Sequence, residues 1–209
     1  MGRRVGVGLG LIAGMLVLVG LLTGVFDRSG LAGGPLAPSA EEGIIGSGIR
    51  LDPGEVFNDH IALVSNPSDQ DAVLISIRRL GVVGVVHDSR TYMALGTNAA
   101  LDGAVTGAGE GFPPRSYSRE HFKDPRGFHV PPSRSKAGHG GAVITTVGRL
   151  RSGETFGLRG YEVTYRVGTT KYRTVIPHAV GVCAAYKERC DPEPLMNRMM
   201  AAAIAARGR

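Results

Sequence analysis

The feature that most constrains this chain is an apolar stretch from Val5 to Phe26 that contains no charged residue. A helix crosses a hydrocarbon core of about 30 Å with about 20 predominantly apolar residues, rising about 1.5 Å at each one. We therefore predict a transmembrane helix over residues 5–26. Since the stretch holds no ionisable side chain, we do not expect a proton or ion pathway within it.

Two arginines, Arg3 and Arg4, precede this stretch. The positive-inside rule places such a basic end in the cytoplasm, so residues 1–4 form a cytoplasmic stub and the rest of the chain lies outside. The predicted location is the cell membrane, with a single pass and the main domain outside the cytoplasm. A cleaved signal peptide is the alternative. Its apolar region usually spans only about 7–15 residues before a small-residue cleavage site, and residues 37–40 fit such a site poorly.

Three glycines within the predicted helix, Gly6, Gly10 and Gly14, are four residues apart and share one face. Small residues at this spacing let a second helix approach closely, so we predict pairing with a partner helix or with a second copy. The alternative is coincidence, because the chain contains 32 glycines. Residues 27–48 are rich in Gly, Ala, Pro and Ser and are predicted to form a flexible linker with a reach of about 25 Å.

From residue 49 onward the chain shows short alternating segments typical of β-strands. The clearest spans Tyr161 to Val167, where apolar and aromatic residues alternate with Glu162, Thr164 and Arg166. Residues 168–170 then form a turn, and residues 171–176 return as the second arm of a hairpin. We expect seven or eight strands, the others being 60–66, 71–80, a pair formed by 82–86 and 91–95, 142–150 and 180–183. This count favours an antiparallel sandwich over a parallel α/β fold.

The turn at residues 66–69 (Asn-Pro-Ser-Asp), the strand at 73–77 and the hairpin at 161–176 resemble immunoglobulin-like or fibronectin-like modules of extracytoplasmic bacterial proteins. The chain is also similar to small single-pass envelope proteins of the actinobacterial type. The resemblance covers about residues 49–183 and implies an all-β, immunoglobulin-like antiparallel β-sandwich over residues 49–190. The chain departs from antibody domains because it lacks tryptophan and a cysteine pair between the sheets. Such folds serve adhesion, scaffolding and ligand binding alike, so the resemblance implies architecture only.

The only cysteines are Cys183 and Cys190, seven positions apart. In an oxidising compartment this pair is expected to form a disulfide. The absence of a C-x-x-C motif argues against redox catalysis, and a zinc site would need further ligands at characteristic spacing.

The segment from 96 to 141 is longer than an ordinary strand connection, and loops beyond about 15 residues are usually functional or disordered. Between Phe112 and Lys136 it carries six basic and two acidic residues, a net charge of +4, with aromatic residues interleaved. We predict that this segment docks an anionic partner or polymer. The alternative is a solvated insertion that caps one end of the sandwich. The predicted binding residues are Arg115, Tyr117, Arg119, Phe122, Lys123, Arg126 and Phe128, and residues 128–130 are a further candidate strand.

Enzyme motifs are absent or incomplete. Residues 138–141 (Gly-His-Gly-Gly) are similar to esterase oxyanion loops, but the sequence has no G-x-S-x-G nucleophile motif. None of the six histidines occurs in H-x-H or H-x-x-x-H spacing. His121, His129 and His139 are the best candidates for a metal site built by the fold, and solvated loop histidines are the alternative. We therefore predict no enzyme activity, no cofactor and no metal.

The last segment, 191–209, is predicted to form a short helix or a tail. Asp191 and Pro192 are typical of a helix start, and the alanines that follow favour helix. One side of this helix is expected to pack on a core or a partner through Leu195, Met196, Met199, Met200 and Ile204. Copper(I) binding by the three methionines is an alternative, because thioethers suit soft ions.

These patterns predict a membrane-anchored extracytoplasmic binding or scaffold module of the cell envelope, non-catalytic, that contacts a protein or an anionic polymer. The alternative is an envelope metal-handling protein or hydrolase with its site in residues 96–141. Nucleic acid is not an expected partner, because aromatic residues make up 6% of the chain and tryptophan is absent.

Overall fold

The computed structural model describes residues 34–38, 46–95, 107–108, 111–113, 118–133, 141–185 and 190–207. The predicted transmembrane helix, with Gly6, Gly10 and Gly14, lies outside these ranges. Within them, no helix is long and apolar enough to cross a membrane.

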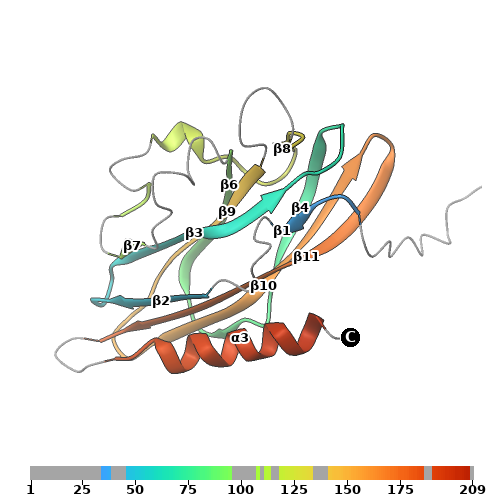
Figure 1. Cartoon of the computed structure of the whole chain (residues 1–209). Coiled ribbons are helices and arrows are strands. Elements are labelled where there is room, and N and C mark those ends of the chain that lie inside the picture. The colour runs from blue at the N-terminus through green and yellow to red at the C-terminus, as the bar shows by residue number, and fades with distance from the viewer. Residues whose placement is uncertain are drawn as a thin grey trace, which may run out of the picture. The chain divides into compact units, whose positions relative to one another are not determined.

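The described chain folds into two sheets and one α-helix (Figure 1). Sheet A has the order β2 (Gly46–Leu51), β11 (Thr170–Ala184), β10 (Thr155–Val167), β4 (Ala72–Leu80) and β8 (His129–Val130), with β5 (Val83–Gly84) also paired to β10. Sheet B has the order β1 (Ala37–Pro38), β3 (Val56–Ser65), β9 (Gly141–Arg149) and β6 (His87–Leu95), with β7 (Gly107–Ala108) also paired to β3. The mainly β fold with a short C-terminal helix agrees with the sequence.

The core lies between the inner faces of the two sheets. Alternation along β10 buries Tyr161, Val163 and Tyr165 completely, while Glu162 and Thr164 face outward. Phe57 of sheet B stacks on a β10 residue of sheet A, Phe156, with ring centroids 5.7 Å apart. The two sheets therefore pack face to face as a β-sandwich.

The β10–β11 hairpin is confirmed, and its strands pair up to Val167 and Thr170. The expected separate strand at 180–183 is the end of β11, which continues to Ala184. β2 pairs with this end in parallel, so the sandwich is not wholly antiparallel. The described residues also form eleven strands rather than seven or eight, because several two-residue strands carry no readable alternation.

The expected pairing of 82–86 with 91–95 is wrong. β5 pairs with β10 in sheet A, whereas β6 pairs with β9 in sheet B. The chain changes sheets between β4 and β6, and its turns use left-handed backbone at Gly81 and Gly84, with φ of 60° and 79°. Two apolar segments near each other in sequence therefore belong to opposite layers.

The sandwich begins earlier than expected. Leu36 is 2% exposed, and its backbone N–H donates a 2.9 Å hydrogen bond to the hydroxyl of Tyr165. Ala37 then pairs with Ser65 in sheet B. Parts of the predicted 27–48 linker, namely residues 36–38 and 46–48, therefore belong to the folded domain.

The C-terminal helix α3 (Glu193–Arg207) covers part of the outer face of sheet A, over β2, β10 and β11 (Figure 1). Leu195, Met199 and Ala203 recur every four residues and are buried against the sheet. Ile204 is 59% exposed, so its predicted place on this side is wrong. Nine residues separate it from Leu195, which turns it about half a revolution away. The predicted Cys183–Cys190 disulfide is present and connects the end of β11 to the segment before α3.

Candidate anion-binding cleft

The part of the 96–141 segment around Phe112 and Phe122 lies over the outer face of sheet B rather than capping one end of the sandwich, whereas β8 pairs with β4 in sheet A. Phe122 is 7% exposed and packs against Ala94 and Val143 of that face. The ring of Phe112 lies 4.7 Å from that of Tyr92 in a stacked pair and 4.8 Å from that of Phe122. This aromatic cluster attaches the segment to β6 and β9.

Backbone hydrogen bonds fix the same segment in register with the edge strand β6. The N–H of Lys123 donates to the carbonyl of Met93 at 2.8 Å, and the N–H of Met93 donates to the carbonyl of Lys123 at 2.9 Å. The 3₁₀ turn η1 (Arg119–His121) directly precedes this contact. The position of Arg119 is therefore set by the residues that follow it.

A cleft of about 390 Å³, here called the arginine cleft, lies between this segment and sheet B. Arg119 comes from η1, Arg90 from β6 and Arg149 from β9, and all three side chains are exposed. Tyr92 and Phe112 supply an aromatic wall. The full lining is Val56, Asp88, Arg90, Tyr92, Gly111, Phe112, Arg119, Val147, Gly148 and Arg149.

The cleft carries excess positive charge. Three guanidinium groups against the single carboxylate of Asp88 leave a net charge of +2. Among the described residues, none of the three arginines forms an ion pair. Planar guanidinium groups bind carboxylates and phosphates through paired hydrogen bonds, so the cleft has the chemistry of an anion site.

A local irregularity in β6 places Arg90 at this site. The register of β6 with β9 shifts between His87 and Arg90, and Asp88 within that bulge has a left-handed φ of 51°. Bulges redirect side chains next to binding sites, and left-handed backbone at a non-glycine residue is energetically unfavourable. Nε2 of His87 donates to Glu154 at 3.0 Å and helps to hold the bulge in place.

The structure separates the predicted docking residues into distinct groups. Arg119 lines the cleft, while Lys123 and Arg126 are exposed outside it. Of the two phenylalanines predicted to dock a partner, Phe122 is buried under the segment and Phe128 is partly buried against the sandwich core. Arg115 and Tyr117 lie outside the described residues. The sequence reasoning missed Arg90 and Arg149 because they come from strands, where outward-facing arginines are common.

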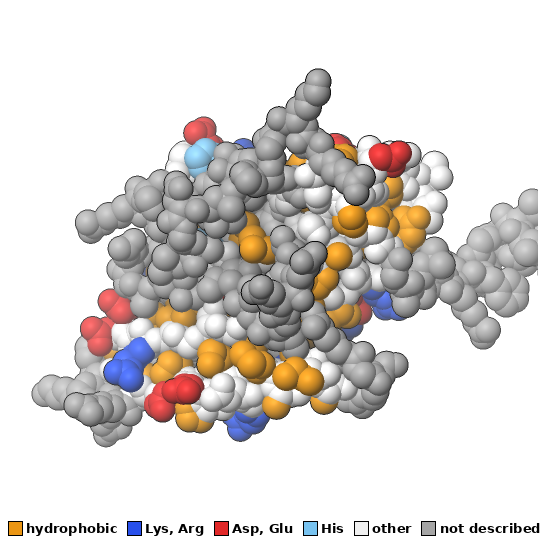
Figure 2. Space-filling model, in the orientation of Figure 1, with side chains coloured by type: hydrophobic (Ala, Val, Ile, Leu, Met, Phe, Trp, Pro, Cys, Tyr) orange, Lys and Arg blue, Asp and Glu red, His pale blue; other side chains and the backbone are white. Residues whose placement is uncertain are grey.

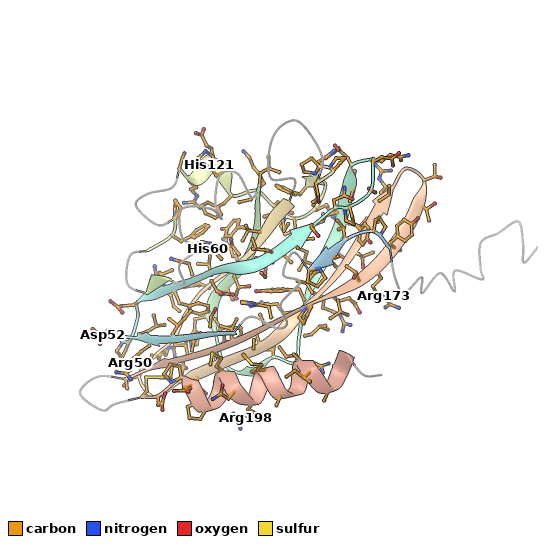
Figure 3. The ribbon with its side chains drawn as sticks, in the orientation of Figure 1. Arg50, Asp52, His60, His121, Arg173 and Arg198 are labelled. Atoms are coloured by element: carbon orange, nitrogen blue, oxygen red, sulfur yellow. A yellow bond between two sulfur atoms is a disulfide. The ribbon has the colours of Figure 1, made fainter. Side chains whose placement is uncertain are left out.

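His60, on β3, lies beneath the same segment (Figure 3). Its ring centroid is 5.6 Å from that of Phe122, and its Nδ1 lies 2.9 Å from the hydroxyl of Thr145. Burial lowers the pKa of His60, and the nearby charge of Asp59 offsets part of that shift. The segment that carries Arg119 therefore rests on a histidine held in its neutral form.

A buried Ser-Asp-His set between the sheets bears on the hydrolase alternative. Ser47 Oγ donates to Asp59 Oδ1 at 3.1 Å, and His178 Nε2 donates to Asp59 Oδ2 at 2.7 Å. In a hydrolytic triad the histidine lies between the serine and the acid, so that it can take the serine proton. Here the aspartate lies between the other two, and all three side chains are buried. This arrangement does not activate Ser47 as a nucleophile.

The loop histidines do not converge among the residues that the structure describes. His129 on β8, in sheet A, pairs with Asp71 at 3.1 Å, while His121 belongs to η1 over sheet B. His139 lies outside the described residues. No group of three potential His, Cys, Asp or Glu ligands occurs within the described ranges. Of the methionines of α3, Met199 is buried between the helix and sheet A, and Met200 packs beside it. This is apolar packing rather than an open thioether site.

No family model matches the sequence, and no curated protein matches it either. Among solved structures, the chain is similar to the ASH/PapD-like domain of human CEP192 (PapD-like domain 7). The alignment has a TM-score of 0.35 and 9% sequence identity, and covers 74% of this chain and 87% of that domain. A similarity this distant carries no functional argument.

Proposed function

We propose that this protein is a non-catalytic binding module that holds an anionic polymer in the arginine cleft of sheet B. The observation that carries this proposal is the convergence of Arg90, Arg119 and Arg149, from three separate elements, without an ion-pair partner among the described residues. A repeating carboxylate or phosphate polymer supplies several anions to one open site, and each charge-assisted hydrogen bond adds to the affinity.

We also propose that the apolar stretch Val5–Phe26 anchors this module in a membrane, with the sandwich outside the cytoplasm. The length and lack of charge of that stretch support the anchor. The disulfide between Cys183 and Cys190 supports an oxidising compartment. The two packed, mainly antiparallel sheets support an immunoglobulin-like class for the sandwich.

The test compares two charge-matched triple variants of the full chain in binding labelled poly-L-glutamate. The first, Arg90→Gln/Arg119→Gln/Arg149→Gln, removes the cleft charges. The control removes three exposed arginines elsewhere, through Arg50→Gln/Arg151→Gln/Arg166→Gln. We expect the cleft variant to weaken binding about tenfold or more and the control by less than about twofold, with salt weakening the wild-type interaction.

Equal losses in the two variants would show that net charge, and not the cleft, attracts the polymer. Membrane fractionation tests the anchor separately. The full chain is expected to stay in the membrane pellet after an alkaline wash, whereas a chain lacking residues 1–33 is expected in the supernatant. Recovery of the full chain in the supernatant would contradict the anchor without affecting the cleft.

A further inference from the structure

A second cavity, of about 350 Å³, lies on the outer face of sheet A where α3 ends. Most of its walls are apolar: Leu80 from β4, Val175 and Pro177 from β11, and Ala203 and Ala206 from α3. Its volume falls at the lower end of the range for small-molecule sites, about 300–1,000 Å³. This cavity, here called the sheet A pocket, is separate from the arginine cleft on sheet B.

Within the described ranges, no residue pairs with the guanidinium group of Arg159 in the sheet A pocket. Nε of Arg159 is buried and makes no hydrogen bond, and Arg159 forms no ion pair with any described residue. A buried N–H group without an acceptor is unfavourable, because it has lost its water without replacing it. Because this atom is closed to water and lies against Gly81, a ligand would use the positive charge of the Arg159 side chain rather than a hydrogen bond from Nε.

The one carboxylate in the lining of this pocket is already paired. Glu162, which also lines the sheet A pocket, accepts a two-point hydrogen bond from Arg78, at 3.2 and 3.1 Å. It lies 3.6 Å from Arg173 as well. Glu162 is therefore already paired with two arginines, Arg78 and Arg173. The positive charge of Arg159 remains available to a ligand.

The C-terminal end of α3 adds partial negative charge beside the positive charge of Arg159, since a helix C-terminus carries about half a negative charge. The guanidinium of Arg159 carries a full positive charge, so the pocket still favours an anion at that point. The other two charged residues of the lining, Arg78 and Glu162, already pair with each other, and the remaining walls are apolar. The pocket therefore fits a molecule with one anionic head and an apolar body.

Apolar surface continues beyond the pocket. Val175 is 50% exposed and Ile204, on α3, is 59% exposed, so both are large apolar side chains open to solvent. Figure 2 shows apolar side chains gathered along α3 and the strands beside it. Val175 continues the apolar wall to the rim of the pocket, and exposed apolar side chains of this kind are typical of binding surfaces, whereas Ile204 faces away from the sheet.

We propose that the sheet A pocket binds a free medium-chain fatty acid, with the carboxylate at Arg159 and the alkyl chain between Val175 and the last turns of α3. A single carboxylate matches the one guanidinium of the lining that has no carboxylate partner among the described residues, and the apolar walls suit an alkyl chain. A diacyl lipid has two chains and is larger than a cavity of this size accommodates.

The test labels the full chain, in its native membranes, with decanoate that carries a photoreactive diazirine. The crosslinked peptides are then mapped by mass spectrometry. We expect label on the peptides that contain Val175 and Ala206, competition by unlabelled decanoate, and at least about tenfold less label from the matching decanol probe, which lacks the charge.

Two variants and their matched controls locate the site. Arg159→Gln removes the charge and Ala206→Phe fills the cavity from the end of α3, so each is expected to reduce labelling about tenfold. Arg166→Gln and Ala201→Phe change exposed residues outside the sheet A pocket and are expected to leave labelling unchanged. The proposal is overturned if decanol labels as strongly as decanoate, if Ala206→Phe labels normally, or if a diacyl phosphatidylglycerol probe labels the same peptides as strongly as the acid.

Discussion

Asp59 on β3 and His178 on β11 connect the two sheets through a buried hydrogen bond. Nε2 of His178 donates to Oδ2 of Asp59 at 2.7 Å, and both side chains are almost completely excluded from water. Ser47 donates to the other carboxylate oxygen, so the acid is hydrogen-bonded from two strands of sheet A. Removing one member of such a pair leaves the other polar group buried without its partner.

The first prediction follows from this pair. Asp59→Ala is expected to lower the free energy of unfolding by about 3–5 kcal/mol, because His178 and Ser47 lose their shared acceptor. Urea-induced unfolding of the wild type and the variant measures the change. Arg78→Ala, which breaks the exposed ion pair with Glu162, is the control and is expected to cost about 0–1 kcal/mol. Equal costs in the two variants would mean that the buried pair adds nothing beyond a surface pair.

The second prediction concerns pH and His60. Because burial lowers its pKa below the ordinary value of 6.5, the unfolded chain binds this proton more readily than the folded chain. The stability that this residue contributes is therefore complete above pH 6.5. It is lost as the pH falls below 6.5 toward the folded-state pKa. We expect His60→Gln to reduce the fall in unfolding free energy between about pH 7.5 and about pH 5.5.

The control for this prediction is His129→Gln, which changes a histidine whose side chain is 62% exposed. Parallel pH profiles for the wild type and His60→Gln would contradict the assignment. The comparison uses the slope with pH and not the absolute stability, so that the loss of the Thr145 contact in the variant does not affect it.

The third prediction concerns the disulfide between Cys183 and Cys190. In the chain-entropy description, a crosslink that closes so short a loop stabilises the fold by about 2–3 kcal/mol. Reduction is expected to lower the free energy of unfolding by that amount, and a Cys183→Ala/Cys190→Ser variant is expected to match the reduced wild type. Urea unfolding with and without reductant measures it. A variant that still responds to reductant would mean that the effect does not come from this bond.

Sequence alternation predicted the strands whose two faces differ. Along β10, Tyr161 and Tyr165 face the core while Glu162 faces outward, which is the signal that a period of two detects. The order of the strands within each sheet leaves no such local signal in the sequence. The crossing between β4 and β6 depends on pairing with β9, a strand about 50 residues later in the chain, and no local pattern encodes that choice.

The candidate anion-binding cleft was predicted only in part, because only its local patterns are visible in the sequence. The basic character of the 96–141 segment indicated an anionic partner, and Arg119 does line the cleft. The sequence alone, however, does not distinguish an aromatic residue that docks a partner from one that anchors the segment to the fold. Phe122 anchors it, because the outer face of sheet B offers Ala94 and Val143 as an apolar surface. Arg90 and Arg149 join the site only through the pairing of β6 with β9.

The last prediction concerns Gly181 on β11, which lies directly under the start of α3. A Cβ atom at this position would lie 2.6 Å from the backbone nitrogen of Met196 and 2.6 Å from the carbonyl oxygen of Pro192. Both are backbone atoms of the segment that begins the helix, and the N–H of Met196 donates a 2.9 Å hydrogen bond to that same carbonyl. No side-chain rotation relieves this contact, so Gly181→Ala must displace the helix or the strand.

We expect Gly181→Ala to lower the free energy of unfolding by about 1–3 kcal/mol, the usual cost of overpacking, and to speed amide hydrogen exchange in α3. Gly48→Ala on the neighbouring strand β2 is the matched control. Its Cβ would lie 3.5 Å from the nearest atom, a side-chain carbon of Pro192, which is an ordinary contact. Exchange in α3 should then stay close to that of the wild type. If Gly181→Ala exchanges as slowly as Gly48→Ala, α3 does not lie as close to β11 as the structure places it.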